Sequence, residues 1–245
     1  AVRFKMVKLY KNFNINKNHK GSIILIGNFD GVHLGHQKLF KLAQSYKKKY
    51  SLRIGVINFD PMPKMFFNQS LKNFRLSSID QKIDLLDNLG VDFIATKKFD
   101  RTFSKTKSIN FIKNILYQKL NAKFIFVSNN FRFGNKREGD VNLLIKNEKK
   151  YKYKVVEPKP LSVKQKVVSS TLIRNLLENG FLEKANKLLG RNWSIVGIVQ
   201  KGRQIGKKIG FPTCNISIKD YVLAKPGVYA VKVLRKNNSK YIKGI

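Results

Sequence analysis

The sequence contains a single cysteine, Cys214, among 245 residues. One thiol cannot form an internal disulfide, and it excludes any metal site built from several cysteines. So few thiols fit a reducing compartment, and we expect a cytoplasmic protein. No apolar run approaches the roughly 20 residues that a membrane-spanning helix needs, so we also expect no membrane partner.

Acidic residues are scarce as well. The chain has 14 Asp and Glu against 50 Lys and Arg, which gives a formal net charge of +36. Such an excess attracts polyanions, and one interpretation is a basic RNA-binding module. The lysines are spread along the chain, however, and Asn, Ile and Phe are abundant too, as an AT-rich genome would produce. We therefore expect no dedicated nucleic-acid partner, although the positive field favours small anionic substrates.

What the chain does contain is a strand–turn–helix pattern near its N-terminus. Residues 23–26 are four consecutive aliphatic side chains, typical of a buried strand, and the glycine-rich residues 27–31 interrupt them. Apolar residues then recur at helical spacing from Leu34. Such a junction directs backbone N–H groups and the positive end of a helix dipole at one point, where phosphate binds.

Two of the three histidines lie at this junction. His33 and His36 are three residues apart, so their side chains share a face of the first helical turn. Gly35 between them leaves room for a ligand to approach the backbone. An imidazole near neutral pH donates hydrogen bonds to phosphate oxygens or carries a proton. The alternative is a pair of ordinary surface histidines, because a glycine-rich turn alone is a weak motif.

Strand and helix signals alternate up to about residue 190. Apolar runs at 52–59, 91–95, 122–127 and 153–156 indicate further strands, and amphipathic stretches separate them. The alternation predicts an α/β fold, in which a parallel sheet has helices on both faces. Ligands of such sheets bind at the carboxyl ends of strands, so we expect the polar turns after the first, second and fourth strands to converge.

A second helix start, later in the chain, has similar chemistry. Ser169, Ser170 and Thr171 precede apolar residues at helical spacing, which predicts a helix with a hydroxyl cap. Three hydroxyls with Arg174 one turn further on form a second candidate phosphate site. The alternative is a plain capped helix with no ligand.

The pattern changes after Gly190. Residues 193–200 alternate apolar and polar side chains, which indicates a strand of an antiparallel sheet. We therefore predict two domains, residues 1–190 and residues 191–245.

Taken in order, the motifs resemble a known family. GNFDGVHLGHQ at 27–37 resembles the HxGH motif of the nucleotidyltransferase superfamily, and VSSTLIRN at 168–175 resembles its ISSTxIR motif. GFPTCN at 210–215 and PGVYAV at 226–231 resemble motifs of riboflavin kinase, a six-stranded β-barrel. The combination resembles the bacterial bifunctional riboflavin kinase/FMN adenylyltransferase (FAD synthetase) family.

That resemblance implies an activity for the first domain. A Rossmann-like nucleotidyltransferase domain would transfer AMP from ATP to FMN, giving FAD and pyrophosphate. The catalytic residues would be His33, His36 and Arg174. The residues that bind ATP would be Gly27, Asn28, Phe29, Asp30, Gly31, Ser169, Ser170 and Thr171. The residues that bind flavin would be Asn58, Pro61, Asn130 and Phe131.

The same resemblance implies a partial riboflavin kinase β-barrel in residues 191–245. Gly210, Thr213 and Asn215 would bind ATP there, and the last two would bind Mg²⁺. The family's catalytic glutamate has no counterpart before Ile245, so we expect little or no phosphorylation of riboflavin. For the first domain, the main alternative is a nucleotidyltransferase with another phosphate acceptor, against which GFPTCN argues. No pattern indicates an oligomeric state.

Overall fold

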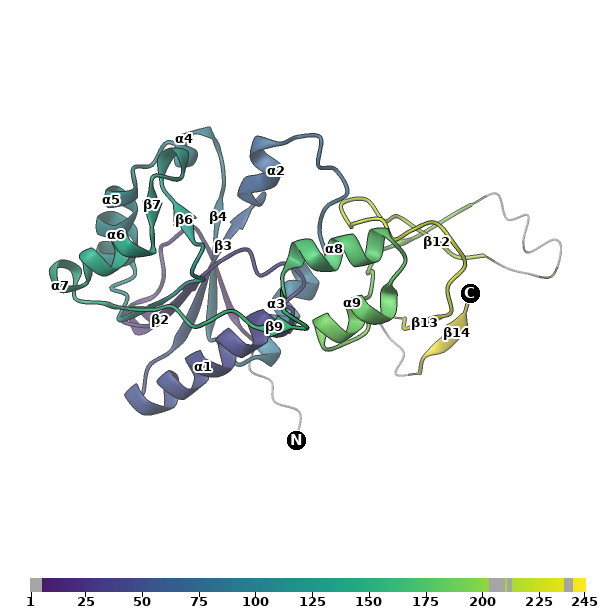
Figure 1. Cartoon of the computed structure of the whole chain (residues 1–245), viewed down its shortest axis with the longest axis horizontal. Coiled ribbons are helices and arrows are strands. Elements are labelled where there is room, and N and C mark those ends of the chain that lie inside the picture. Colours follow the sequence, from purple (N-terminus) through teal and green to yellow (C-terminus); the bar gives the residue numbers. More distant parts are fainter. Residues whose placement is uncertain (1–5, 203–209, 211–212, 236–239) are drawn as a thin grey trace.

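The computed structural model describes residues 6–202, 210, 213–235 and 240–245, and Figure 1 shows the path of the chain. At its centre is a six-stranded parallel sheet in the order β1-β4-β3-β2-β5-β8. The strands are β1 Lys8–Lys11, β2 Ile23–Ile26, β3 Ile54–Asp60, β4 Phe93–Lys98, β5 Phe124–Phe126 and β8 Lys154–Val156. The sheet confirms the predicted α/β class.

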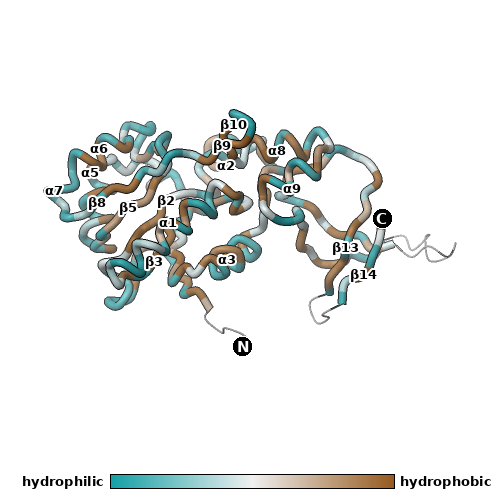
Figure 2. Tube along the Cα trace, turned by 60° about the horizontal axis from the view of Figure 1, so that its bottom comes forward, coloured by the Kyte–Doolittle hydropathy of each residue, from teal (hydrophilic) through white to brown (hydrophobic). Residues whose placement is uncertain are grey.

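Helices cover both faces of this sheet, as Figure 1 shows. Side chains of α1 (Leu34–Tyr50) and α3 (Ile79–Asn88) pack on one face, and those of the π-helix η2 (Phe111–Lys119) and α6 (Val141–Lys146) pack on the other. The side chains of β2 alternate between the two cores, because successive residues of a strand point to opposite faces. Buried on both sides, β2 consists only of aliphatic residues. Hydrophobic colours accordingly follow the sheet strands in Figure 2.

The remaining helices are short or lie at the edges of the sheet. They are η1 Lys17–His19, α2 Pro63–Phe67, α4 Arg101–Ser104, α5 Ser108–Asn110, η3 Asn135–Arg137, α7 Glu148–Tyr151, α8 Ser170–Glu178 and α9 Leu182–Leu189. Two hairpins of two-residue strands complete this part: β6 Arg132–Phe133 with β7 Gly139–Asp140, and β9 Ser162–Val163 with β10 Lys166–Val167.

One strand of the sheet was not predicted. Edge strand β1 has the sequence KLYK and shows no residue buried on either face, so its hydrophobic pattern is weak. Its place comes from backbone pairing with β4, in which Leu9 lies opposite Ile94. Edge strands are decided by such pairing more than by burial, which explains why periodicity missed it.

The second region contains two small antiparallel sheets. β11 Val199–Gln200 pairs with β12 Asn215–Ile216, and β13 Val231–Val233 pairs with β14 Ile242–Gly244. The predicted strand over 193–200 is therefore limited to its last two residues. Residues 193–196 instead contact the first region: Gln81 on α3 donates to the backbone oxygen of Ser194 at 3.1 Å.

A third core joins this region to helices α8 and α9. It contains Leu76, Ile173, Leu177, Ala185, Leu189 and Val222. The backbone segment 74–77 lies at this junction, since Trp193 donates its indole N–H to the Leu76 oxygen at 2.9 Å. The backbone N–H groups of Phe74 and Arg75 both donate to the oxygen of Asp220. These contacts set the position of a segment that also borders the site described below.

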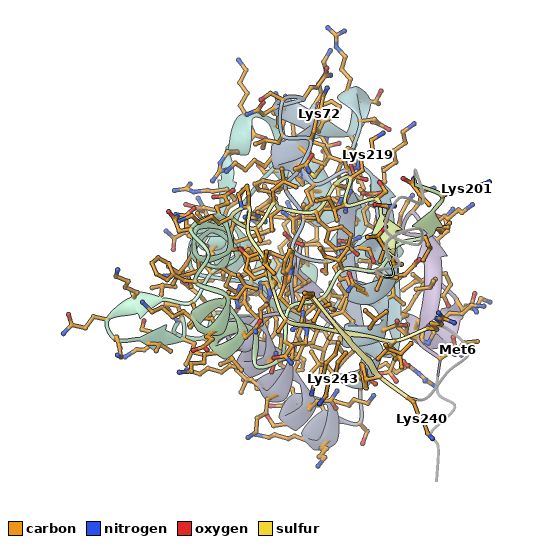
Figure 3. All side chains as sticks on the ribbon, turned by 90° about the vertical axis from the view of Figure 1, so that its right-hand side faces the viewer. Met6, Lys72, Lys201, Lys219, Lys240 and Lys243 are labelled. Atoms are coloured by element: carbon orange, nitrogen blue, oxygen red, sulfur yellow. The ribbon has the colours of Figure 1, made fainter. Side chains whose placement is uncertain are left out.

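Basic side chains project on every side of the molecule. Figure 3 shows them around the outline, with Lys72 and Lys219 near the top of the view, Lys201 at its right-hand side, and Lys240 and Lys243 near the bottom. This distribution matches the spread of lysines along the sequence. Among the described residues, no helix has both the length and the apolar character needed to cross a membrane.

Candidate active site

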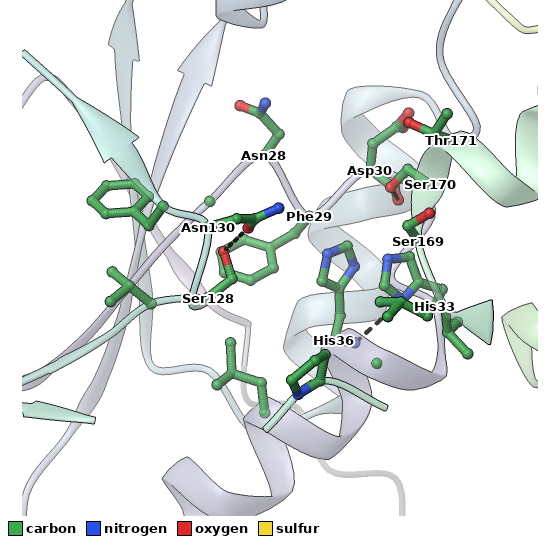
Figure 4. A pocket seen from close by; sticks show the side chains of 18 of the residues that line it. Asn28, Phe29, Asp30, His33, His36, Ser128, Asn130, Ser169, Ser170 and Thr171 are labelled. Carbon is green, nitrogen blue, oxygen red and sulfur yellow. Dashed lines mark hydrogen bonds between the residues drawn. The ribbon is translucent and has the colours of Figure 1, made fainter. Parts of the chain in front are cut away.

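A cavity of about 550 Å³ opens at the carboxyl ends of the central strands. Its wall comes from residues 26–30 after β2, Phe59 and residues 62–64 after β3, residues 127–132 after β5, and residues 167–171 at the start of α8. The predicted convergence of the polar turns is thus confirmed. Figure 4 shows the histidines and the α8 hydroxyls around the same space, with Ser128 and Asn130 across from them.

The two histidines form one unit at the start of α1. His33 is the N-cap residue, and its Nδ1 accepts a hydrogen bond from the backbone N–H of His36 at 3.4 Å. The imidazole rings stack with their centroids 3.6 Å apart. A Cβ on Gly35 would lie 3.1 Å from the His33 ring, so glycine is needed here for packing as well as for ligand access. Nδ1 of His36 is buried and has no hydrogen-bond partner within the part of the chain that the structure describes, and His36 lines the cavity.

Both imidazoles are neutral at physiological pH. Burial lowers the pKa of His33 to about 4, and the nearby charges of Arg191 and Arg174 act in the same direction. Burial also lowers the pKa of His36 well below its usual value, with further contributions from His33 and Lys82. A neutral imidazole offers one N–H donor and one acceptor, so each histidine can donate a single hydrogen bond to a phosphate oxygen.

We expect the protein to lose thermal stability as the pH falls from 6.5 toward 4. In the unfolded chain a histidine binds its proton near pH 6.5, whereas folded His33 stays neutral down to about pH 4. The unfolded state therefore binds more protons in this window and is favoured by acid. Thermal unfolding at a series of pH values should show a shallower decline for His33→Asn than for the wild type. Equal declines would contradict the assignment.

Asp30 and Arg174 form a buried ion pair in the wall of the cavity. Oδ2 of Asp30 lies 2.6 Å from Nη2 of Arg174, and the side chains are 5% and 9% exposed. The carboxylate also accepts hydrogen bonds from the backbone N–H groups of Leu76 and Ser77. Arg174 donates from Nε to the oxygen of Phe74 at 2.7 Å and stacks on its ring. The Asp30 carboxylate thus accepts from three donors within the protein while it also lines the cavity.

The hydroxyl residues lie at the N-terminus of α8. Ser169 is the N-cap residue, and its oxygen accepts from the backbone N–H of Leu172 at 3.2 Å. Ser170 donates to the backbone oxygen of Asp30 at 2.9 Å, which ties α8 to the turn after β2. Thr171 is exposed and lines the cavity. The two predicted phosphate sites therefore face one cavity.

Of the four residues predicted to bind flavin, two line the cavity and two do not. Asn130 and Phe131 line the cavity, and the hydroxyl of Ser128 donates to Oδ1 of Asn130 at 2.9 Å. Asn58 is only 2% exposed and lies behind the wall, where its oxygen contacts Lys82. Pro61 directly precedes the lining residue Met62.

Comparisons with known proteins agree with this geometry. The sequence model described as FAD synthetase matches residues 15–172, and the one described as riboflavin kinase matches residues 189–245. The bifunctional riboflavin kinase/FMN adenylyltransferase of Buchnera aphidicola subsp. Schizaphis graminum is 43% identical, over 94% of this chain and 74% of that protein. The chain belongs to this family.

Two further proteins are similar to the chain. The bifunctional riboflavin kinase/FMN adenylyltransferase of Escherichia coli K12 is 37% identical over 88% of this chain and 69% of that protein. A crystal structure of a macrolide-efflux protein from Streptococcus pneumoniae superposes with a TM-score of 0.84. It is 25% identical and covers 97% of this chain and 78% of its own.

In the riboflavin kinase region, the structure describes all three residues that were predicted to bind ATP or metal. Gly210 has a φ of +84°, which favours glycine, while Phe211 and Pro212 of the same motif lie outside the described residues. Thr213 and Asn215 are exposed, and neither is part of the cavity wall described above. Among the described residues, no group of three or more His, Cys, Asp or Glu is placed to hold a metal ion.

Two cations near the family's HxGH motif were not predicted. Arg191 donates to the backbone oxygens of Gly31 at 2.6 Å and Leu189 at 3.3 Å, and so joins the end of α9 to the turn before α1. Lys82 lies on the buried face of α3. The sequence contained a signal for Lys82, because a charged residue stood at helical spacing between apolar ones. An arginine after a helix-ending glycine has no such signal.

Proposed function

We propose that the protein transfers AMP from ATP to FMN in this cavity. Residues 1–190 form the domain that catalyses the transfer. The observation that carries this proposal is that two helix N-termini border one cavity, one with paired imidazoles and one with three hydroxyls. A triphosphate can contact both at once. An oxygen of the FMN phosphate attacks the α-phosphorus of ATP in line, the bond to the β-phosphate oxygen breaks, and pyrophosphate leaves.

Catalysis would come from positioning and from stabilising negative charge. His33 and His36 each donate an N–H to the phosphoryl oxygens as charge develops, and backbone N–H groups of residues 27–31 add to this. On the other side, the hydroxyls of Ser169 and Thr171 and the backbone N–H of Ser170 bind the departing pyrophosphate at the N-terminus of α8. Arg174 uses Nε and one Nη2 hydrogen within the protein, which leaves the guanidinium edge at Nη1 for phosphate.

Flavin would bind against the loop after β5. Phe131 stacks on Phe133 with ring centroids 5.4 Å apart, so the pair offers an aromatic surface for a planar ring. The amide of Asn130 has its oxygen engaged by Ser128, and its N–H₂ group can donate to a flavin carbonyl.

Mg²⁺ would enter this cavity with ATP. The Asp30 carboxylate is occupied by Arg174 and two backbone N–H groups, so phosphate oxygens would supply most of the metal's ligands. In residues 191–245, Thr213 and Asn215 are exposed oxygen-bearing side chains two positions apart, and they fit a hard cation with few protein ligands. We propose them, with Gly210, as the ATP and metal residues of the riboflavin kinase region.

An assay with ATP labelled at the α-phosphate would test the adenylyl transfer. With FMN as acceptor we expect labelled FAD, separated by thin-layer chromatography, and an equal amount of unlabelled pyrophosphate, measured by a coupled assay. Faster AMP transfer to another phosphate-bearing acceptor, tested beside FMN, would overturn the assignment. Riboflavin with ATP labelled at the γ-phosphate measures the family's second activity. Steeply salt-dependent RNA binding would instead favour a role for the basic surface.

A further inference from the structure

Lys82 is a buried cation behind the turn that follows β2. It lies on α3, is 4% exposed, and was assigned no role above. Its Nζ donates to Oδ1 of Asn58 at 2.7 Å and to the backbone oxygen of Asn28 at 3.2 Å. Both of these acceptors are uncharged. A buried ammonium hydrogen-bonded to neutral groups is costly, which makes a contribution from packing alone a poor explanation.

The two acceptors lie where the cavity wall begins. Asn28 is the second residue after β2 and lines the cavity, and Asn58 lies near the carboxyl end of β3. Lys82 therefore joins the ends of two neighbouring strands from the side of α3. Any movement of this ammonium would move the first residues of the phosphate-binding turn.

The donor-only chemistry of a lysine ammonium determines how both groups are oriented. An ammonium has three N–H donors and no acceptor, so Asn58 must turn its oxygen toward it and its N–H₂ group away. The carbonyl of Asn28 must likewise point toward α3. In a planar trans peptide the next N–H points the opposite way, so the N–H of Phe29 faces away from α3.

The charge of Lys82 also acts on the histidine pair. It is one of the charges that lower the pKa of His36, and it lies close enough to Asp30, Asp60 and Arg75 to interact with them. A positive charge behind the turn stabilises the negative charge of a phosphate in front of it.

We propose that Lys82 is a positioning residue for AMP transfer, which holds the Asn28–Phe29 peptide and the Asn58 amide in the orientation that binds nucleotide phosphate. The proposal rests on the function proposed above. It extends the site to a residue on α3 that does not itself line the cavity, and it assigns Asn58 to this supporting layer.

Lys82→Met tests the proposal, with Lys47→Met as the matched control. Lys47 also bonds a backbone oxygen, that of Gly90, and pairs with the buried Asp92 at 2.6 Å. It bridges α1 to the amino end of β4, away from the cavity. For Lys82→Met we expect kcat/KM for ATP to fall by about 10- to 100-fold, as for a small misplacement of a binding group. ATP affinity measured by calorimetry should weaken about tenfold, whereas Lys47→Met should lose stability and keep both values.

The pH profile provides a readout that a merely structural lysine would not change. Burial lowers the pKa of Lys82 to about 8, against opposing effects of Asp30 and Asp60 and a further lowering by Arg75. The charge is thus present below pH 8 and lost above it, so kcat/KM of the wild type should decline above this pH. This alkaline decline should be absent from Lys82→Met. Lys82→Arg, which stays charged, should restore part of the activity at high pH.

Three results would overturn the proposal. The first is a kcat/KM for Lys82→Met within twofold of the wild type. The second is a decline of kcat/KM above pH 8 that is the same in this variant as in the wild type. The third is a loss of kcat/KM and ATP affinity no larger than that of Lys47→Met, compared at equal folded fraction. If Lys82→Met does not fold, Lys82→Gln keeps a donor without the charge and should still abolish the alkaline decline. Should the wild type bind ATP but form no FAD, the proposed function fails, while ATP affinity still decides the role of Lys82.

Discussion

Replacing His36 by alanine should reduce kcat for FAD formation by about a hundredfold or more. Removing one preorganised donor to a developing oxyanion typically costs about 3 to 4 kcal/mol of barrier. His36 fits that role because its Nδ1 is buried and unpartnered in a cavity that a triphosphate can fill. Single-turnover measurements with saturating ATP and FMN would separate the chemical step from binding, and KM for FMN should change much less than kcat.

The matched control for this variant is His19→Ala. His19 is also buried, at 7% exposure, and its ring stacks on Phe93 in the core rather than at the cavity. Its loss should lower stability and leave kcat of the folded protein close to that of the wild type. If His36→Ala turned over at a near-normal rate, or if both variants lost activity equally, the catalytic role of the histidine pair would be wrong.

Replacing Asp30 by asparagine should lower the free energy of unfolding by about 3 to 5 kcal/mol. The substitution leaves the Arg174 guanidinium buried without its counter-charge, since the pair is 2.6 Å apart and almost fully shielded from water. Asparagine keeps one oxygen to accept from Leu76 and Ser77, so the expected loss comes chiefly from the unpaired charge. Urea denaturation followed by tryptophan fluorescence would measure it.

Asp140→Asn provides the comparison for this second prediction. Asp140 pairs with Arg132 at 3.5 Å, and the two side chains are 33% and 47% exposed. Exposed pairs contribute about 0 to 1 kcal/mol, and asparagine can still cap α6 at this position. A loss for Asp30→Asn as small as that for Asp140→Asn would show that Arg174 finds other partners and that the ion pair is not what holds segment 74–77 to the site.

The fold was predictable wherever hydrophobic periodicity was strong. Residues 23–26 and 122–127 read as buried strands, and the structure places β2 and β5 there. Periodicity failed at β1, whose KLYK pattern shows no buried face, and over 193–198, where side chains such as Gln81 and Tyr221 bond the backbone in place of a neighbouring strand. In both places the partner across space, and not the local pattern, decides the conformation.

The site was predictable as far as its chemical groups lie next to one another in the chain. HxGH and SSTLIR each contain a complete helix start, so their donors could be read directly. The roles of Asp30 and Lys82 could not, because the partners of Asp30 are 46 or more positions away and those of Lys82 are 54 and 24. The sequence shows a carboxylate in the turn after β2, and only the structure shows that an arginine pairs with it.

The sequence by itself determined the alternation of strands and helices, the two helix starts that we propose to bind phosphate, and the family, because these depend on short-range spacing and on side-chain type. Only the tertiary structure decided which of the charged residues are engaged within the protein and which remain for a ligand. Charge pairing and burial depend on distances in space, and Lys82 and Arg174 reach the turn that contains Asp30 only when helices α3 and α8 pack against it.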